Sequence, residues 1–392
     1  MPQDEGSSTR SVHYGRHGGP SPRCIVPPLV SNVAFAFEDP KTWQAVALHQ
    51  APGDIYSRNS NPTTRLFEET VAALEAAESA TSFATGMAAI STTLFALLSP
   101  GQRAVTVRDT YGGTFLIFTQ ILPRFGVICE VCDTDDHEAL EASIGRGCDL
   151  VYLESPTNPT LKVLDLERVI GAAHKAGAVA VVDNTFATPI NQNPVAFGAD
   201  LVIHSATKFL GGHGDVLGGV VCGRKDLVEK IYHYREIVGP SLDAHAAHVL
   251  LRSLKTLGLR VQRQNENALA LACFLNGQVK VERVYYPGLE SDPGHAIAKR
   301  QMRGFGGVLS FELKGGVEAV GRFLPRLRYA FMAANLGQVE TIIGPPALTS
   351  HVELSAEERV AAGIPEGLIR YAAGIEDLDD LKADLEAALD GL

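Results

Sequence analysis

Short, almost purely apolar runs alternate with longer segments of helical apolar spacing between about residues 65 and 225. The runs are Arg103–Arg108, Asp149–Leu153, Ala178–Asp183 and Asp200–Ile203. Their length and composition are typical of strands that are buried on both faces. Alternation of such strands with helices predicts a mostly parallel sheet covered by helices, and therefore an α/β fold.

A glycine-rich stretch with one lysine, His204–Asp215, follows the last of these runs. Ser205 and Thr207 offer hydroxyls to an anion and Lys208 offers an amine, at the end of a strand where α/β sheets bind ligands. An amine that can form a Schiff base beside hydroxyls that can hold a phosphate suits pyridoxal 5′-phosphate (PLP). A lysine after a strand is also commonly a solvated charge, so this stretch alone does not decide the function.

Asp183 ends the preceding apolar run. A carboxylate in this place can pair with the ring nitrogen of PLP and keep that nitrogen protonated, which makes the ring an electron sink. An aspartate after a strand is also a common helix N-cap. Asp183 and Lys208 at the ends of two successive strands, with a helical segment between them, together favour a PLP site.

Further motifs occur in order along the chain. They are Tyr56-Ser57-Arg58-Asn59-Ser60-Asn61-Pro62-Thr63, Thr85-Gly86-Met87-Ala88-Ala89-Ile90, Asp109-Thr110-Tyr111-Gly112-Gly113-Thr114, Glu154-Ser155-Pro156-Thr157-Asn158-Pro159, Val182-Asp183-Asn184-Thr185-Phe186, the lysine stretch, and Gly367-Leu368-Ile369-Arg370. With these motifs the chain resembles the Cys/Met-metabolism family of PLP-dependent enzymes, from about Ser11 to its C-terminus. The family includes cystathionine γ-synthase, cystathionine γ- and β-lyases, methionine γ-lyase and O-acylhomoserine sulfhydrylases.

The resemblance implies a particular domain organisation. The fold is the PLP-dependent transferase fold of the aspartate-aminotransferase type (fold type I), with a mostly parallel central sheet covered by helices and a smaller α+β C-terminal domain. We expect an N-terminal arm at residues 1–60, a large PLP-binding domain at 61–252 and a C-terminal domain at 253–392. The Pro- and Gly-rich part of the arm is predicted to be extended, and Met1–Arg10 to be disordered. In the family the arm reaches a neighbouring subunit, which implies a homodimer with shared active sites and, commonly, a homotetramer.

The resemblance also implies which residues hold the cofactor. Lys208 carries PLP and acts as the general base, Asp183 pairs with the ring nitrogen, and Tyr111 stacks on the ring and can carry protons. The remaining cofactor-binding residues are Gly86 and Met87 at a helix start, Ser205, Thr207, Asn158 at the ring hydroxyl, and Tyr56 and Arg58 from the neighbouring subunit. Taken by themselves, Gly86 could mark a simple tight turn, Tyr111 could be a half-buried aromatic residue, and Arg58 could form a surface salt bridge.

Arg370 matches the family's arginine for the substrate carboxylate, and Asn335 and Tyr56 are also expected at the substrate. A bidentate arginine would orient the Cα–H bond of an amino acid. Its alternative is an ion pair with Glu376 or Asp377. The sequence departs from the family at Ala334-Asn335, where Glu-Ser or Val-Ser is usual, at Gly113, where methionine γ-lyases carry a cysteine, and at Arg235-Glu236, where those lyases carry Lys-Asp.

These features lead to a hypothesis for the reaction. We expect γ-replacement, through a vinylglycine-type intermediate, on a homoserine- or methionine-type amino acid whose Cγ leaving group is an acyl ester, a thiolate or a sulfonium. Such a reaction would suit specialised biosynthesis. The alternatives are γ-elimination to a 2-oxo acid and ammonia, as in methionine and cystathionine γ-lyases, and a β-lyase reaction.

Composition limits the partners. The 392 residues carry a net charge of −11, which disfavours nucleic acid and anionic membranes as partners. We expect no membrane span, a cytoplasmic location and a small-molecule amino acid as the partner. Cys129 and Cys132 form a single CxxC inside a strand-like run, which favours buried thiols over a metal site. The glycines after Lys208 do not form GxGxxG, which disfavours a nicotinamide-dependent oxidoreductase.

Overall fold

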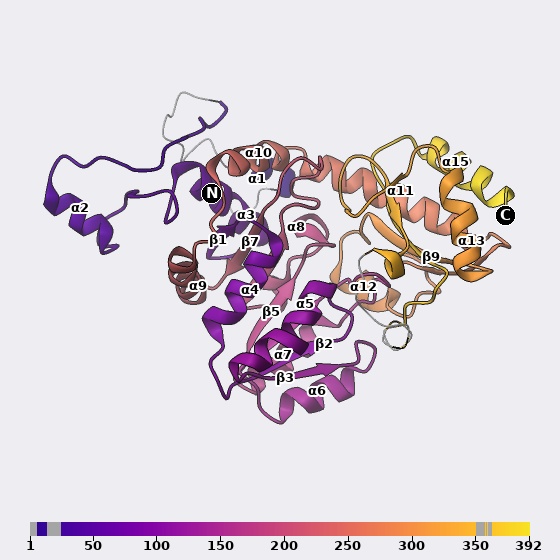
Figure 1. The fold of residues 1–392 in the computed structure, drawn as a ribbon, viewed down its shortest axis with the longest axis horizontal. Coiled ribbons are helices and arrows are strands. Elements are labelled where there is room, and N and C mark those ends of the chain that lie inside the picture. Colours follow the sequence, from indigo (N-terminus) through magenta and orange to yellow (C-terminus); the bar gives the residue numbers. More distant parts are fainter. Residues whose placement is uncertain (1–5, 14–24, 350–356, 358, 360–362) are drawn as a thin grey trace.

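The computed structural model describes residues 6–13, 25–349, 357, 359 and 363–392 (Figure 1). Its strands form two sheets. The larger has the order β1-β7-β6-β5-β4-β2-β3 and the smaller has the order β10-β11-β12-β9-β8. The strands are β1 (Ser79–Phe83), β2 (Arg103–Val107), β3 (Ile128–Cys132), β4 (Leu150–Glu154), β5 (Val179–Asp183), β6 (Leu201–Ser205), β7 (Gly219–Gly223), β8 (Val281–Tyr285), β9 (Val308–Leu313), β10 (Phe331–Met332), β11 (Ile342–Gly344) and β12 (Leu368–Ala372).

The larger sheet is mostly parallel, which confirms the predicted α/β class. Strands β3, β2, β4, β5 and β6 run parallel to one another, whereas β7 pairs antiparallel with both β6 and β1. The predicted strands fall within one or two residues of the observed ones at β2, β4, β5 and β6. The parallel strands therefore bring their carboxyl ends to one edge of the sheet, which is where ligands bind in such folds.

Both faces of this sheet are buried, and the side chains of each strand alternate between two cores. In β4, Leu150 and Tyr152 pack on one face, and Val151 and Leu153 pack on the other. The first core contains side chains of α4 (Gly86–Leu97) and α9 (Lys225–Val238). The second contains side chains of α3 (Pro62–Glu75), α6 (His137–Gly145), α7 (Leu166–Lys175) and α10 (Ala244–Leu254). Burial on both sides explains why these strands are apolar throughout.

The smaller sheet has its own core, which includes side chains of α11 (Leu257–Asn276), α13 (Gly316–Phe323) and α15 (Leu378–Asp390). The long helix α11 extends from the larger sheet to the smaller one (Figure 1). Other α-helices in the described part of the chain are α1 (Ser7–His13), α2 (Pro40–Ala47), α5 (Gly112–Leu116), α8 (Thr188–Asn191) and α12 (His295–Gln301). Residue 252, the predicted domain limit, lies inside α10, and that limit stays a prediction.

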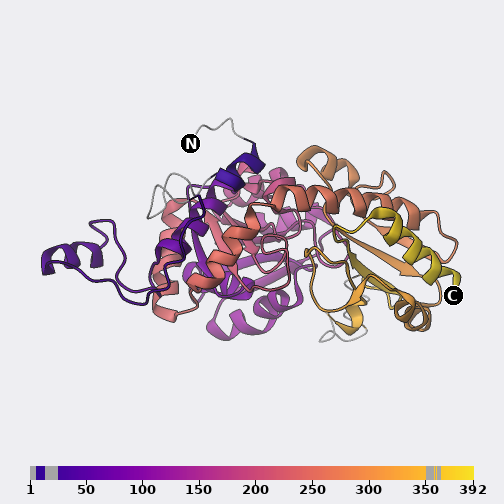
Figure 2. The ribbon, with the colours of Figure 1, turned by 90° about the horizontal axis from the view of Figure 1, so that it is seen from above.

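The part of the N-terminal arm that contains α2 projects from the body of the molecule, and the sequence did not predict this helix (Figures 1 and 2). Helix α2 begins after Asp39, whose side chain accepts a hydrogen bond from the Thr42 N–H (2.9 Å). The prediction of disorder over Met1–Arg10 is wrong for Ser7–Arg10, which belong to α1; residues 1–5 lie outside the described part. None of the helices in the described ranges has the length and apolarity that a membrane span requires.

Candidate active site

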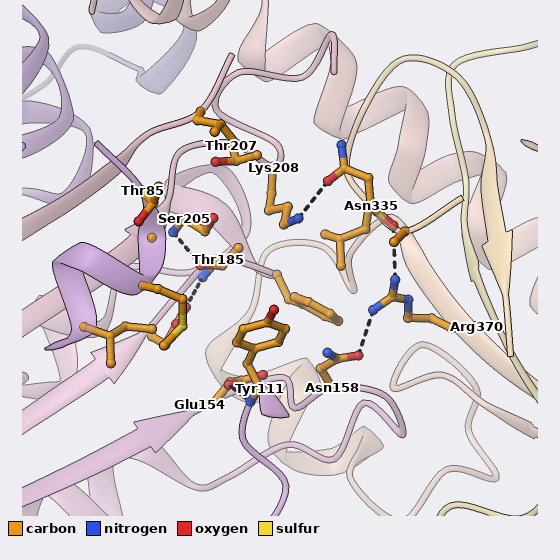
Figure 3. Close-up of a pocket in the computed structure, with 18 of the residues that line it drawn as sticks. Thr85, Tyr111, Glu154, Asn158, Thr185, Ser205, Thr207, Lys208, Asn335 and Arg370 are labelled. Carbon is orange, nitrogen blue, oxygen red and sulfur yellow. Dashed lines mark hydrogen bonds between the residues drawn. The ribbon is translucent and has the colours of Figure 1, made fainter. Parts of the chain in front are cut away.

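A cavity of about 330 Å³ lies at the carboxyl edge of the larger sheet. Three polar residues end neighbouring parallel strands there: Glu154 on β4, Asp183 on β5 and Ser205 on β6. The register places Glu154 directly opposite Asp183. The smaller sheet closes the other side of the cavity with Arg370 on β12 and with Asn335 from the segment between β10 and β11 (Figure 3). Residues from the regions of both sheets therefore contribute to one site.

Lys208 lies in the turn after β6, and its amine points into the cavity (Figure 3). Its Nζ donates a hydrogen bond to Asn335 Oδ1 at 2.7 Å. Burial, together with the nearby Arg370 guanidinium, lowers the pKa of the Lys208 amine to about 8. About a tenth of this amine is therefore neutral at pH 7, and the neutral form is the one that nucleophilic attack or proton abstraction requires.

The Asp183 carboxylate is buried and held by neutral donors. Oδ1 accepts from the Thr185 N–H (3.0 Å) and Oδ2 accepts from the Tyr152 hydroxyl (3.1 Å). Burial raises the pKa of Asp183, and the hydrogen bonds from Thr185 offset part of that rise. Burial and the charge of Asp183 also raise the pKa of Glu154 well above its usual range. Two buried carboxyls side by side favour a cationic group between or beside them.

The start of α4 forms a cradle for an anion. Thr85 caps this helix by accepting the Ala88 N–H at 3.0 Å, so the first N–H groups, at Gly86 and Met87, point away from the helix toward the cavity. A Cβ at Gly86 would lie 2.7 Å from Ser205 Oγ, so only glycine allows this approach of helix and strand. The side chains of Ser205 and Thr207 line the same part of the cavity.

Arg370 is buried, and its fork is fixed on both arms. Nη1 donates to Asn158 Oδ1 (3.0 Å) and Nη2 donates to the Asn335 carbonyl (3.1 Å). Burial lowers the pKa of Arg370 to about 10, so it stays charged at neutral pH. The alternative ion pair with Glu376 is wrong, because that carboxylate accepts from the N–H (2.6 Å) and hydroxyl (2.9 Å) of Thr341. The alternative with Asp377 is also wrong, because Asp377 pairs with Arg263.

Tyr111 lies at the mouth of the cavity, and its side chain is 43% exposed. Its N–H donates to Glu154 Oε2 at 2.8 Å, which fixes the start of the short helix α5. A Cβ at Gly113 would meet the Tyr111 ring at 3.0 Å and Met87 Sδ at 3.1 Å. The space that a side chain at position 113 would occupy is therefore filled by Tyr111 and Met87.

Tyr56 and Arg58 are not brought to this cavity. Both lie on the N-terminal arm, where the Arg58 guanidinium lies 5.2 Å from the centroid of the Tyr56 ring. Arg58 Nε donates to the Glu236 carbonyl at 2.9 Å. The prediction that these residues complete the site of a neighbouring subunit therefore stays a prediction.

Comparison with known proteins agrees with this geometry. Residues 8–390 match the family described as Cys/Met metabolism PLP-dependent enzyme. The chain belongs to this family. A cystathionine γ-synthase 1, chloroplastic, from Nicotiana tabacum is 44% identical over 94% of this chain and 68% of its own length. An L-methionine γ-lyase from Fusobacterium nucleatum subsp. polymorphum is 42% identical over 93% of each chain.

The fold agrees as well. The crystal structure of a cystathionine γ-synthase from Xanthomonas oryzae pv. oryzae, in complex with aminoacrylate and cysteine, matches 98% of each chain with a TM-score of 0.93 and 39% identity. The protein is thus a PLP-dependent enzyme of fold type I, as the sequence predicted. Its substrates are amino acids.

The residues of the cavity fit PLP. Asp183 offers a buried carboxylate whose two hydrogen-bond donors are neutral, and a protonated ring nitrogen would supply the missing positive charge. The start of α4 with Ser205 and Thr207 offers hydrogen-bond donors to a phosphate. Lys208 offers the amine between them. We infer these roles for Asp183, the start of α4, Ser205, Thr207 and Lys208. We also infer that Asn158 donates to the ring hydroxyl, because its oxygen accepts from Arg370 and its amide N–H₂ is left to donate.

Sequence reasoning missed several residues of the site. Glu154, Thr185, Thr85 and Phe186 line the cavity, and Tyr152 contacts Asp183 from the neighbouring strand. Thr85 carried a usable signal, because a threonine before a helix start is a preferred N-cap. The contact between Tyr152 and Asp183 depends on the register of β4 and β5, which no local pattern reveals.

Proposed function

We propose that this enzyme catalyses γ-replacement on a homoserine-type amino acid that carries a leaving group at Cγ. PLP, when bound, supplies the electron sink that makes the Cα and Cβ protons acidic. The observation that carries the proposal is the position of the Lys208 amine, 2.7 Å from Asn335 and at the same end of the cavity as the Arg370 fork. An amino acid held by Arg370 therefore presents its Cα to a base of lowered pKa.

Residues of this chain carry out each step of the proposed reaction. Arg370 binds the substrate carboxylate and orients Cα, and Lys208 removes the Cα proton. Asn335 Oδ1 accepts from the Lys208 amine and keeps it on the substrate side. The same amine can hold a proton and release it nearby, so a second proton can leave Cβ. The Cγ–X bond then breaks with its electron pair, and X leaves as HX with one of the two abstracted protons. A nucleophile H–Nu forms the new Cγ–Nu bond, and its proton and the one held by Lys208 return to Cβ and Cα, so that the net change is replacement of X by Nu.

The cavity favours a nucleophile without an ammonium group. Ala334 lines it with a methyl group, at the position where the family resemblance implies an acid in cystathionine γ-synthases and γ-lyases. An ammonium on the incoming molecule would therefore lack a carboxylate partner at this position. The cavity lining also includes the apolar side chains of Leu217, Leu336 and Ile90, which suits sulfide or a small thiol better than cysteine.

Methionine γ-elimination is the closest competing reaction. Relatives of both kinds are similarly identical to this chain, so overall identity does not separate the two reactions. Gly113 argues against elimination, because Tyr111 and Met87 occupy the space that the cysteine of methionine γ-lyases would need.

Product analysis tests the proposal. The PLP-loaded enzyme is incubated with O-acetyl- or O-succinyl-L-homoserine and with sulfide, methanethiol or cysteine, and the products are followed by mass spectrometry and a 2-oxo acid assay. We expect substitution products with sulfide or methanethiol and little with cysteine. Ala334→Glu is expected to raise the use of cysteine relative to sulfide, and Lys208→Ala to abolish turnover. Formation of 2-oxobutyrate alone, or turnover of β-substituted amino acids alone with pyruvate as product, would overturn the proposal.

A further inference from the structure

A second group of chemically competent side chains lies away from the cavity, where the N-terminal arm meets helix α9. His49 follows α2 on the arm, and His233 and Glu236 lie on α9. One potential ligand atom from each of these residues lies within 4.8 Å of the other two. None of the three has a role in the reaction proposed above. We propose that His49, His233 and Glu236 bind one divalent ion of the zinc class, and that this ion fastens the arm to α9.

Two of the ligands are placed by the helix itself. His233 and Glu236 are three residues apart, so both project from the same face of α9. His233 Nδ1 and Glu236 Oε1 lie 3.0 Å apart, close to the separation of two ligands on a tetrahedral zinc ion, which is about 3.4 Å for bonds of about 2.0–2.1 Å. The pair is therefore already spaced for chelation.

The third ligand is placed by an unusual turn. His49 has φ = 55°, a left-handed conformation that glycine adopts at lower energy after a helix. Its N–H donates to the Val46 carbonyl (3.0 Å) and closes the end of α2. This turn brings the His49 ring to a centroid distance of 5.4 Å from His233 and 5.9 Å from Tyr232. A modest side-chain rotation would bring its nitrogen into bonding range.

Asn59 orients the Glu236 carboxylate, as hydrogen-bonding neighbours orient the ligands of metal sites. Asn59 Nδ2 donates to Glu236 Oε2 at 2.8 Å, which leaves Oε1 directed to His233. A cavity of about 210 Å³ lined by His49, Asn59, Tyr232 and Glu236 adjoins the group and leaves room for an ion and its water. Two imidazoles and one carboxylate form a donor set typical of Zn²⁺ with an open position.

The alternative without a metal is a surface ion pair between His233 and Glu236, with the His49 ring packed beside it. That arrangement needs neither His49 in a left-handed turn nor a third ligand atom within reach. The metal site has a distinct consequence: it would tie the arm to α9 beside Arg58, whose Nε donates to the Glu236 carbonyl. Binding of the ion would then order the arm segment that carries Tyr56 and Arg58.

Calorimetry on the PLP-loaded, chelator-treated enzyme tests the site. ZnCl₂ is titrated at a pH of about 7.5, because zinc binds the neutral form of an imidazole ring. We expect one equivalent per chain in the wild type. In His49→Gly, which keeps the turn, we expect binding to be weaker by about tenfold or more. The matched control is His245→Ala, an exposed histidine on α10, which should bind as the wild type does. Equal affinity in His49→Gly, or no saturable binding in the wild type, would overturn the proposal.

A second readout separates a metal site from a change in the arm. Hydrogen exchange of peptides covering residues 44–60 is compared with and without ZnCl₂ in the wild type and in Glu236→Gln, which keeps the size of the side chain. We expect zinc to slow exchange in the wild type only. Slowing of the same size in both proteins would contradict the assignment of Glu236 as a ligand.

Discussion

At the scale of single residues, the protonation of Lys208 governs both cofactor attachment and proton transfer. Burial and Arg370 lower its pKa to about 8, so about a tenth of the amine is neutral at pH 7, against less than about one part in a thousand at a pKa of about 10.4. A lowered pKa makes the neutral form dominant above pH 8. We therefore expect the rate of PLP uptake by the apoenzyme to rise about tenfold per pH unit up to about 8 and then to level off.

Stopped-flow absorbance after removal of PLP with hydroxylamine measures this profile. Lys208→Ala serves as the control and should develop no covalent PLP band. A rate that keeps rising to about pH 10 would mean that Lys208 has the pKa of an ordinary exposed lysine.

Arg370 illustrates how one residue depends on its shape as well as its charge. Both arms of its fork are held, by Asn158 and by the Asn335 carbonyl. Arg370→Lys keeps the charge but loses the planar fork, and a lost charged hydrogen bond is worth about 1.5–3 kcal/mol. We expect kcat/KM for the amino acid to fall about 10- to 150-fold. Steady-state kinetics measure the loss, and an unchanged PLP absorbance shows that the cofactor site is intact. Unchanged kcat/KM would remove Arg370 from the substrate site.

At the scale of elements, the contact between the start of α4 and the end of β6 shapes the phosphate cradle. In Gly86→Ala the new Cβ would lie 2.7 Å from Ser205 Cβ and Oγ and 3.0 Å from its Cα, so helix and strand must separate. We expect the Kd for PLP to rise about tenfold and the free energy of unfolding of the apoenzyme to fall by about 1–3 kcal/mol. Fluorescence titration and urea unfolding measure the two effects.

Gly171→Ala is the matched control for this substitution. Gly171 lies inside α7 with nothing within 4 Å of its Cβ position, and it needs no positive φ. Alanine there should raise the free energy of unfolding by about 0.5–1 kcal/mol and leave PLP affinity unchanged. If both variants weakened PLP binding equally, the contact with Ser205 would not be the cause.

Sequence patterns predicted the elements whose cause is local and missed those that depend on distant contacts. The strands β2, β4, β5 and β6 are apolar because both faces are buried, and that property is visible in the sequence. Asn61 marks the start of α3 by a local contact, since its side chain accepts the Thr63 N–H. Helix α2 was hidden because it lies on a Pro- and Gly-rich arm. The bond between Lys208 and Asn335 joins residues 127 positions apart, so only the packed domains reveal it.

At the scale of the whole molecule, the active-site cavity is lined by residues from the regions of both sheets, whereas the described part of the N-terminal arm of the same chain contributes none of the lining residues. Lys208 and Asp183 come from the larger sheet, and Arg370 and Asn335 come from the region of the smaller one. Tyr56 and Arg58 lie on the N-terminal arm and do not line the cavity. If the arm completes a neighbour's site, each site of a dimer needs residues from two chains, and the isolated subunit lacks donors that the family uses for phosphate.

Mixing two inactive variants tests this arrangement. Arg58→Ala damages only the site to which its arm contributes, and Lys208→Ala damages only its own cavity. A dimer with one copy of each therefore has one site with both defects and one intact site. After the two proteins are unfolded together and refolded in equal amounts, half of the dimers are mixed, so we expect about a quarter of wild-type activity. Each variant refolded alone provides the baseline. Activity no higher than the mean of the two baselines would show that Arg58 acts within its own chain.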